Sequence, residues 1–131
     1  MAIFSPNSLS RLQTCHPFLQ DLFNEVIKHQ DCSIISGYRG REEQEAAFND
    51  GKSKAHYGQS NHNFHPSLAV DVMPYPINWD DIKGIHRFAG FVKGIAAAKG
   101  IPIRWGGEFK NFFDGPHYEL IGITGKLKED Q

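Results

Sequence analysis

Asp71 lies in the middle of an apolar segment, residues 68–73, with the sequence LAVDVM. The segment is typical of a buried strand, and a buried carboxylate is costly unless it is paired or binds a metal. His62 and His65 precede it in the chain, and His117 begins a further apolar segment. Two histidines and one carboxylate that leave a fourth position open are the ligand set of a catalytic zinc site. The residue types therefore suggest a metal centre built from Asp71, His117 and one of the upstream histidines.

A structural explanation of the same residues is also open. A buried aspartate beside a histidine can form an ion pair without any metal. The sequence contains no HExxH motif and no pair of CxxC motifs, which are the common local signatures of zinc sites. Spacing alone therefore does not decide between a metal centre and an ion pair.

Two further charged residues are candidates for catalysis. Asp114 precedes His117 by a short Gly-Pro turn, which can place its carboxylate where it acts as general base and then as general acid. Arg39 ends the segment SGYR, and a guanidinium at a strand end can stabilise an oxyanion or hold a substrate carboxylate. The simpler interpretations are a turn-forming aspartate before glycine and a surface arginine that pairs with Glu42 or Glu43.

Glu119 and His56 are further candidates near the site. Glu119 shares a face with His117 on a regular strand, so it can orient that histidine or form a structural salt bridge. His56 lies in a polar segment, residues 52–67, which we expect to be a loop at the site. In that position His56 can contact a substrate.

The elements expected around these residues are helices and short strands in alternation. Apolar residues recur at helical spacing over 17–29 and over 79–99, the latter with Asn78 as N-cap and Gly100 as C-cap. A shorter helix is expected over 41–49, strands over 32–38, 68–73, 101–105 and 117–121, and a frayed charged tail over 122–131. This order predicts an α+β domain with a small, mainly antiparallel sheet packed against helices.

The composition indicates a globular chain. The sequence has 131 residues, 40% of them hydrophobic and 22% charged, so we expect one domain over 1–131. A formal net charge of −1 gives no support for nucleic-acid binding. No apolar stretch reaches the length of a membrane span and no secretory signal is visible, so we expect a protein made in the cytoplasm and not bound to membranes. Cys15 and Cys32 are expected to be buried, reduced thiols.

Several segments together resemble a known family of zinc peptidases. They are SGYRGREEQ (36–44), Gly51-Lys52-Ser53, SNHNFHPSLAVDVMPYP (60–76), Trp79, IRWGGEF (103–109) and DGPHYEL (114–120). In this order they resemble the D-Ala-D-Ala carboxypeptidase and L-alanyl-D-glutamate endopeptidase family, which includes VanX and VanY, and they look most like its phage endolysin branch. The resemblance implies a hedgehog/D-Ala-D-Ala-peptidase-like fold and a Zn²⁺ cofactor.

The resemblance also implies a role for each matching residue. The positions that match the zinc ligands of the family are His62, Asp71 and His117. Asp114 matches the catalytic acid/base, and Arg39 matches the arginine that stabilises the tetrahedral intermediate. Ser60 matches a polar residue near the substrate and the metal.

One departure from the family pattern concerns the first ligand. In the common pattern, Ser-x-His-x-x-Gly-x-Ala-x-Asp, the histidine is closer to the aspartate than His62 is to Asp71 here. An insertion between the two residues explains the difference and makes His65 an alternative ligand. We expect His62 to be the ligand, because Ser60 and Asn63 frame it as in the pattern, and His65 to lie at the rim of the cleft.

The function that the resemblance implies is peptidoglycan degradation. We expect an endolysin that hydrolyses the L-Ala–D-Glu bond of the stem peptide, acts as a monomer, and needs a holin or a similar pore to reach the wall from the host cytoplasm. A D-Ala-D-Ala carboxypeptidase is the alternative within enzymes. A peptidoglycan-binding module that keeps zinc without catalysis is the alternative from another class, although such a module needs neither Asp114 nor Arg39.

Overall fold

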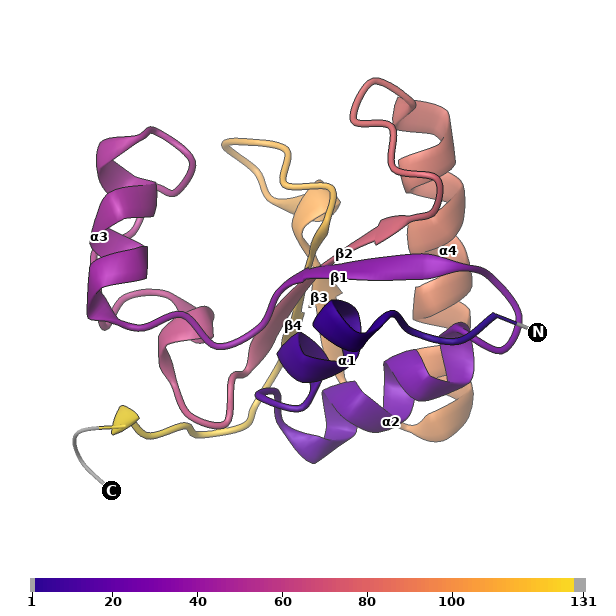
Figure 1. Ribbon diagram of the computed structural model, residues 1–131, viewed down its shortest axis with the longest axis horizontal. Helices are drawn as coiled ribbons and strands as arrows, with labels where there is room; N and C mark the ends of the chain where they lie inside the picture. Colours follow the sequence, from indigo (N-terminus) through magenta and orange to yellow (C-terminus); the bar gives the residue numbers. More distant parts are fainter. Residues whose placement is uncertain (1, 129–131) are drawn as a thin grey trace.

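The computed structural model describes residues 2–128 of the chain. Its elements are, in order, α1 (Pro6–Leu12), α2 (Pro17–Val26), β1 (Cys32–Ser36), α3 (Arg41–Asn49), η1 (Asn61–Asn63), β2 (Ala69–Pro74), α4 (Ile82–Lys99), β3 (Ile103–Trp105), η2 (Gly106–Glu108) and β4 (His117–Leu120). Figure 1 shows the strands crossing the centre of the molecule, with α1 and α2 below them, α4 on the right and α3 by itself on the left.

The strands form one sheet in the order β1-β2-β4-β3, and every pairing in it is antiparallel. The predicted α+β class with a small antiparallel sheet is confirmed. β2 and β4 are the central strands, so each is hydrogen-bonded to a neighbour on both sides. Side chains on these two strands are therefore held on the most constrained backbone of the fold.

Alternation along the central strands gives the sheet two different faces. Val70 of β2 lies opposite Tyr118 of β4, and both side chains are fully buried. The next pair along the ladder, Asp71 opposite His117, points to the other face. The alternation that builds the core thus also sets two polar residues side by side on the opposite surface of the sheet.

Helices α2 and α4 cover the apolar face. Phe23 of α2 and Phe88 of α4 contact the ring of Tyr118. The centroid of the Tyr118 ring lies 5.4 Å from that of Phe23 and 6.5 Å from that of Phe88, which is the range of aromatic pairs in protein cores. All three rings are buried, and burial of a large apolar side chain is worth about 1.5–3 kcal/mol. This packing anchors β4 directly beneath the residues that it presents on its polar face.

The long helix starts later than predicted. α4 begins at Ile82 rather than at Trp79, and its N-cap is Asp81 instead of Asn78. The Asp81 carboxylate accepts a hydrogen bond of 3.0 Å from the third residue of the helix. Because asparagine and aspartate are equally good N-caps, residue type could not locate the first turn. The predicted C-cap is confirmed, since Gly100 has a φ of 69°.

Other boundaries also differ from the prediction. α1 was not predicted, α2 ends at Val26 rather than at residue 29, and β1 and β3 are shorter than the predicted strands. The segment predicted to fray is ordered in part, because the backbone N–H of His65 donates to the carbonyl of Lys126 at 2.9 Å. Residues 129–131 of that segment lie outside the described residues.

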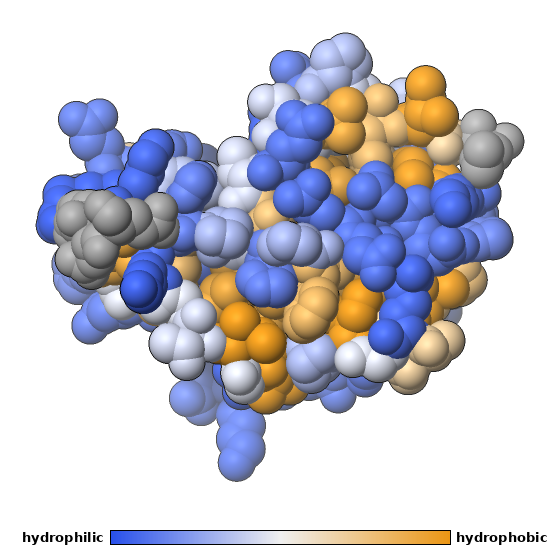
Figure 2. Space-filling view, turned by 90° about the horizontal axis from the view of Figure 1, so that it is seen from below, coloured by the Kyte–Doolittle hydropathy of each residue, from blue (hydrophilic) through white to orange (hydrophobic). Residues whose placement is uncertain are grey.

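Helix α3 belongs to a polar part of the molecule. Gln44 is its buried residue, and Glu42 and Glu43 occupy its first turn. Figure 1 shows it separated from the core helices by the sheet, and Figure 2 shows that the surface on this side is mainly hydrophilic. Polar contacts, more than apolar burial, must therefore connect α3 to the rest of the fold.

The composition also led to expectations about membrane-spanning helices and about the two cysteines. None of the helices within residues 2–128 is both long and apolar enough to cross a membrane. Cys15 and Cys32 are buried and free, as predicted. Burial raises the pKa of each thiol to about 12, so both are protonated and unreactive at neutral pH.

Candidate active site

Asp71 and His117 are placed next to one another by the pairing of β2 with β4. They are direct cross-strand partners, and the Cβ atoms of such partners are about 4.5–5.5 Å apart. Oδ1 of Asp71 lies 3.3 Å from Nδ1 of His117. On its other side Asp71 pairs with Ser36 of β1, after a shift in register between Ile34 and Ser36. Bulges of this kind redirect the chain and are common next to functional sites.

His62 reaches the same point from the loop that precedes β2. It lies in η1, and Oγ of Ser60, the N-cap, accepts a hydrogen bond of 3.2 Å from the backbone N–H of His62. Nδ1 of the His62 ring lies 2.8 Å from the carbonyl of Gly37. A carbonyl can only accept, so Nδ1 carries a proton and Nε2 is left as the ligand atom. Nε2 lies 3.2 Å from Oδ1 of Asp71.

The three donor atoms fit a zinc ion. The ligand atoms of His62, Asp71 and His117 lie within 4.8 Å of one another. Zinc–ligand bonds of about 2.1 Å in a tetrahedral site put neighbouring donors about 3.4 Å apart, close to the 3.2 and 3.3 Å found between Asp71 and the two rings. Two imidazoles and one carboxylate form the donor set of catalytic zinc sites with an open position.

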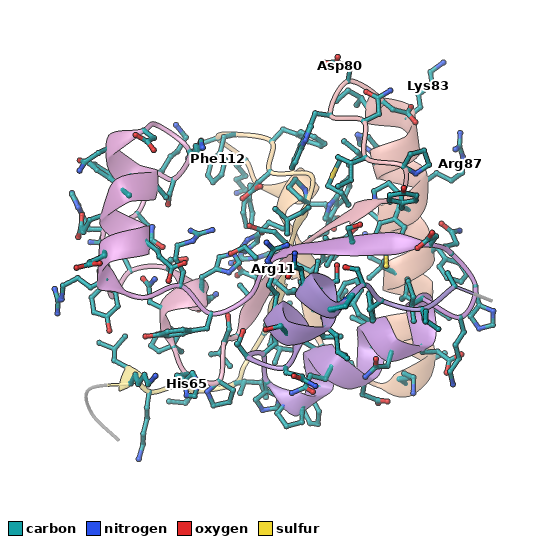
Figure 3. The ribbon with its side chains drawn as sticks, viewed as in Figure 1. Arg11, His65, Asp80, Lys83, Arg87 and Phe112 are labelled. Carbon is teal, nitrogen blue, oxygen red and sulfur yellow. The ribbon has the colours of Figure 1, made fainter. Side chains whose placement is uncertain are left out.

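His65, the alternative ligand, lies elsewhere. Its ring packs edge-on against Tyr38, with centroids 5.1 Å apart, and it lines a separate pocket beside Leu68 and Lys126. Figure 3 shows it in the lower part of the molecule, near the C-terminal segment. The fold thus brings His62, and not His65, to Asp71.

The site concentrates charge in a buried position. Burial opposes ionisation of Asp71, but the neighbouring His62 and His117 outweigh it and hold the pKa of this carboxyl well below its usual range. Burial likewise opposes a charge on His117, whereas hydrogen bonds with Asp71 and Glu119 raise its pKa to about 9. Metal binding must displace any proton on the ligand atom, so the ion and the proton compete for this ring.

The contacts of Glu119 fit both of the roles expected for it, which are orienting His117 and forming a salt bridge. Its Oε1 accepts a hydrogen bond of 2.7 Å from Nε2 of His117, and its Oε2 pairs with Arg104 at 2.7 Å. Burial opposes ionisation of Glu119, but these two partners outweigh it and lower the pKa of Glu119 to about 2. The carboxylate therefore fixes the His117 ring with Nδ1 directed at Asp71, as carboxylates behind metal-bound histidines do.

Replacing Glu119 by alanine is expected to weaken zinc binding by roughly 10- to 100-fold, the usual effect of losing a carboxylate behind a ligand histidine. The loss follows because His117 is no longer held in its ligand orientation. Competition with a chromophoric chelator measures the zinc affinity. Glu108→Ala is the matched control, since Glu108 pairs with Lys93 at 2.9 Å on the surface. Equal affinities of the two variants would contradict the orienting role.

Asp114 lies on the turn that leads into β4. Its backbone N–H donates to the carbonyl of Gly106 at 3.1 Å, and Nε1 of Trp105 donates to the carbonyl of Gly115 at 2.6 Å. A Cβ on Gly106 would lie 2.3 Å from the Asp114 carbonyl oxygen, so only glycine allows this close approach. The turn places Oδ2 of Asp114 3.8 Å from Nδ1 of His117.

The environment of Asp114 suits proton transfer. Burial and the negative charge of Asp71 raise the pKa of Asp114, although the two histidines and Arg39 act in the opposite direction. A carboxylate with a raised pKa holds a proton more readily and can return it to a leaving group. Its side chain is 36% exposed, which leaves it accessible from the cleft.

Arg39 points toward Asp71, one of the candidate metal ligands, rather than toward the surface. Its Nη1 donates to Oε1 of Gln44 at 3.0 Å, and its Nη2 lies 3.5 Å from Oδ2 of Asp71. The carboxylate that it faces is therefore Asp71, instead of Glu42 or Glu43 as the simpler interpretation held. A guanidinium in this position can stabilise negative charge that develops beside the candidate metal ligands.

These residues open into one cleft of about 560 Å³. One wall consists of residues 51–55 and 59–61, which follow α3, and the other of Phe109, Phe112 and Phe113. Nζ of Lys54 lies over the ring of Phe112 at 5.5 Å, so the two walls meet at the mouth. Figure 3 shows Phe112 at the tip of its loop, on the side of the cleft facing α3.

Sequence reasoning missed the aromatic and lysine lining of this cleft. Phe112 and Lys54 lie in segments without any period or motif, and Lys52 was noted only as part of the Gly51-Lys52-Ser53 segment. Their shared position depends on how two loops meet. His56 was a candidate for substrate contact. It pairs instead with Glu45 at 2.8 Å and is not among the described residues that line the cleft.

Comparison with known proteins agrees with this architecture. The model of the family described as "Phage L-alanyl-D-glutamate peptidase" matches residues 1–121. The chain therefore belongs to the phage L-alanyl-D-glutamate peptidase family.

Two relatives are similar over much of the chain. The peptidoglycan L-alanyl-D-glutamate endopeptidase CwlK of Bacillus subtilis (strain 168) is 31% identical over 104 residues, which are 70% of this chain and 61% of CwlK. The chain thus spans about three fifths of that relative. The crystal structure of the L-Ala D-Glu endopeptidase ChiX of Serratia marcescens matches with a TM-score of 0.76 and 28% identity, over 90% of each chain.

Proposed function

We propose that the protein is a zinc-dependent endopeptidase that hydrolyses the L-Ala–D-Glu bond of the peptidoglycan stem peptide. The observation that carries this proposal is the arrangement of the three donors in one cleft with a carboxylate and a guanidinium. Asp114 lies 3.8 Å from His117 on one side, and Arg39 lies 3.5 Å from Asp71 on the other. A site that only binds metal for structure needs neither group.

His62, Asp71 and His117 are the residues that would hold the ion. When bound there, zinc supplies a Lewis acid that polarises a carbonyl and makes water a better nucleophile at neutral pH. Within residues 2–128 the group contains three protein donors, and the cleft leaves the site accessible to substrate.

The protein's own residues supply the proton transfer and the charge stabilisation. The Asp114 carboxylate takes the proton of the attacking water, and its raised pKa helps it to hold that proton until the C–N bond begins to break. It then gives the proton to that nitrogen as the C–N bond breaks. The Arg39 guanidinium, held by Gln44, donates to the carbonyl oxygen as it becomes negative.

The choice of bond is supported by the relatives. CwlK and ChiX are both named as L-Ala–D-Glu endopeptidases, as is the family, which favours this bond over a terminal D-Ala. Membership of a phage family fits the further proposals that the protein is made in the host cytoplasm and reaches the wall through a holin-type pore. That it acts as a monomer is a separate proposal.

Mass spectrometry of muropeptides after digestion tests the proposed bond. We expect products with a new carboxyl terminus on L-Ala and a new amino terminus on D-Glu, and no products when zinc is removed by a chelator. Release of D-Ala alone would instead identify a D-Ala-D-Ala carboxypeptidase. Binding of peptidoglycan with no cleavage at all would identify a non-catalytic module.

A further inference from the structure

Gln44 is a fully buried amide at the base of the cleft, with a relative exposure of 0%. Its Oε1 accepts hydrogen bonds from Nη1 of Arg39 and from Nδ2 of Asn63, each at 3.0 Å. Its Nε2 donates to Oγ of Ser53 at 2.9 Å and to the carbonyl of Ala55 at 2.7 Å. Both acceptor positions and both N–H groups of the amide are therefore occupied.

The orientation of this amide is determined by its neighbours. Oδ1 of Asn63 accepts from the backbone N–H groups of Gly58 and Ser60, at 2.9 and 3.1 Å, so Nδ2 of Asn63 must be a donor. Arg39 has only donors. The oxygen of Gln44 must therefore face Arg39 and Asn63, and its amino group must face the opposite direction.

The groups joined by Gln44 are parts of the candidate active site. Its oxygen holds Arg39, whose Nη2 is directed at Asp71 and whose backbone N–H donates to the carbonyl of His62 at 2.8 Å. Its amino group holds Ser53 and Ala55, which line the cleft. One buried side chain thus connects the guanidinium beside the metal ligands with the wall of the cleft.

We propose that Gln44 is a positioning residue, which aims the Arg39 guanidinium at the reacting carbonyl and holds the cleft wall formed by residues 51–55. The inference rests on the proposed peptidase function. Arginine has several rotatable bonds. Without the contact to Gln44, Asp71 would be the main partner of the Arg39 guanidinium. An ion pair with Asp71 draws the guanidinium toward the metal ligands and away from the substrate oxygen. Gln44 prevents this by holding Nη1, whereas the nitrogen that faces Asp71 is Nη2.

Gln44→Met tests the inference, because methionine keeps the length of the side chain and removes all four hydrogen bonds. We expect kcat to fall by roughly 10- to 100-fold, the effect of a misplacement of about 1 Å in a catalytic group. We expect KM to rise, since the wall at Ser53 and Ala55 loses its anchor. Zinc content is expected to stay unchanged, because Gln44 contacts none of the three donors.

A double-mutant cycle with Arg39→Ala separates positioning from general structural support. If residue 44 influences kcat through Arg39, then Gln44→Met lowers kcat by less than about threefold in the Arg39→Ala background, whereas its effect on KM persists. An equal loss of kcat in both backgrounds would overturn the proposal. So would an unchanged kcat in the single variant.

If the methionine variant does not fold, Gln44→Glu takes its place in the double-mutant cycle. It keeps the two acceptor bonds, and its effect on kcat must likewise disappear when Arg39 is absent. Gln20→Met is the matched control, because Gln20 donates to the carbonyl of Cys15 at 2.8 Å far from the cleft, and it is expected to leave kcat and KM unchanged. A parent protein that cuts no stem peptide refutes the proposed function, whereas an active parent with an additive cycle refutes only the role of Gln44.

Discussion

Replacing Asp114 by asparagine is expected to lower kcat for stem-peptide cleavage by about 10²–10⁴-fold, the usual contribution of a general acid/base. The amide keeps the size of the side chain and cannot take a proton from water. Zinc content is expected to stay at the parent level, because Asp114 is not one of the proposed metal donors, which are His62, Asp71 and His117. Turbidity loss of outer-membrane-stripped cells and kinetics on purified stem peptides measure the effect, and elemental analysis measures the zinc.

Asp80→Asn is the control for a loss of one carboxylate. Asp80 is exposed, and Figure 3 shows it on the loop before α4, at the outer end of the molecule, so its replacement is expected to leave lysis unchanged. Lysis by the Asp114 variant at the parent rate would refute its role as the base. Loss of zinc from that variant would show that Asp114 acts as a ligand instead.

Replacing His62 by alanine is expected to remove zinc from the protein and to abolish lysis. Only Asp71 and His117 would remain as donors, and a metal ion contributes several kcal/mol of transition-state stabilisation, which corresponds to a loss of roughly 10³-fold or more in rate. Elemental analysis after dialysis measures the metal. Circular dichroism shows whether the variant is folded, because the buried ring also donates to the Gly37 carbonyl.

His65→Ala is the matched variant, since His65 lies in the same loop and was the alternative candidate ligand. Its ring contacts Tyr38 and lines a separate pocket, so the variant is expected to keep its zinc and most of its activity. If His65→Ala loses the metal while His62→Ala retains it, the choice of ligand is reversed.

The sequence pointed to residues that the fold brings together, whereas it placed the ends of several elements wrongly. Asp71 stood out because a carboxylate within an apolar strand has a large energetic cost, and this signal is local in the chain. The α+β class was predictable for the same reason, because the period at which apolar residues recur and the positions of glycine and proline are also local features of the chain. The first turn of α4 was not, because Asn78 and Asp81 are equally good caps and packing decides between them.

Which residues lie together in the site depends on contacts between segments that are far apart in the chain. Spacing alone left both His62 and His65 open, and only the resemblance favoured His62; in the structure η1 and the Gly37 carbonyl bring His62 to Asp71. The sequence assigned no role to Gln44, although it is fully buried between Arg39 and the cleft wall. Hydrogen bonds between residues far apart in the chain depend on strand pairing and loop closure, which no local pattern encodes. The sequence therefore determined the chemistry that is available, and the fold determined where that chemistry is assembled.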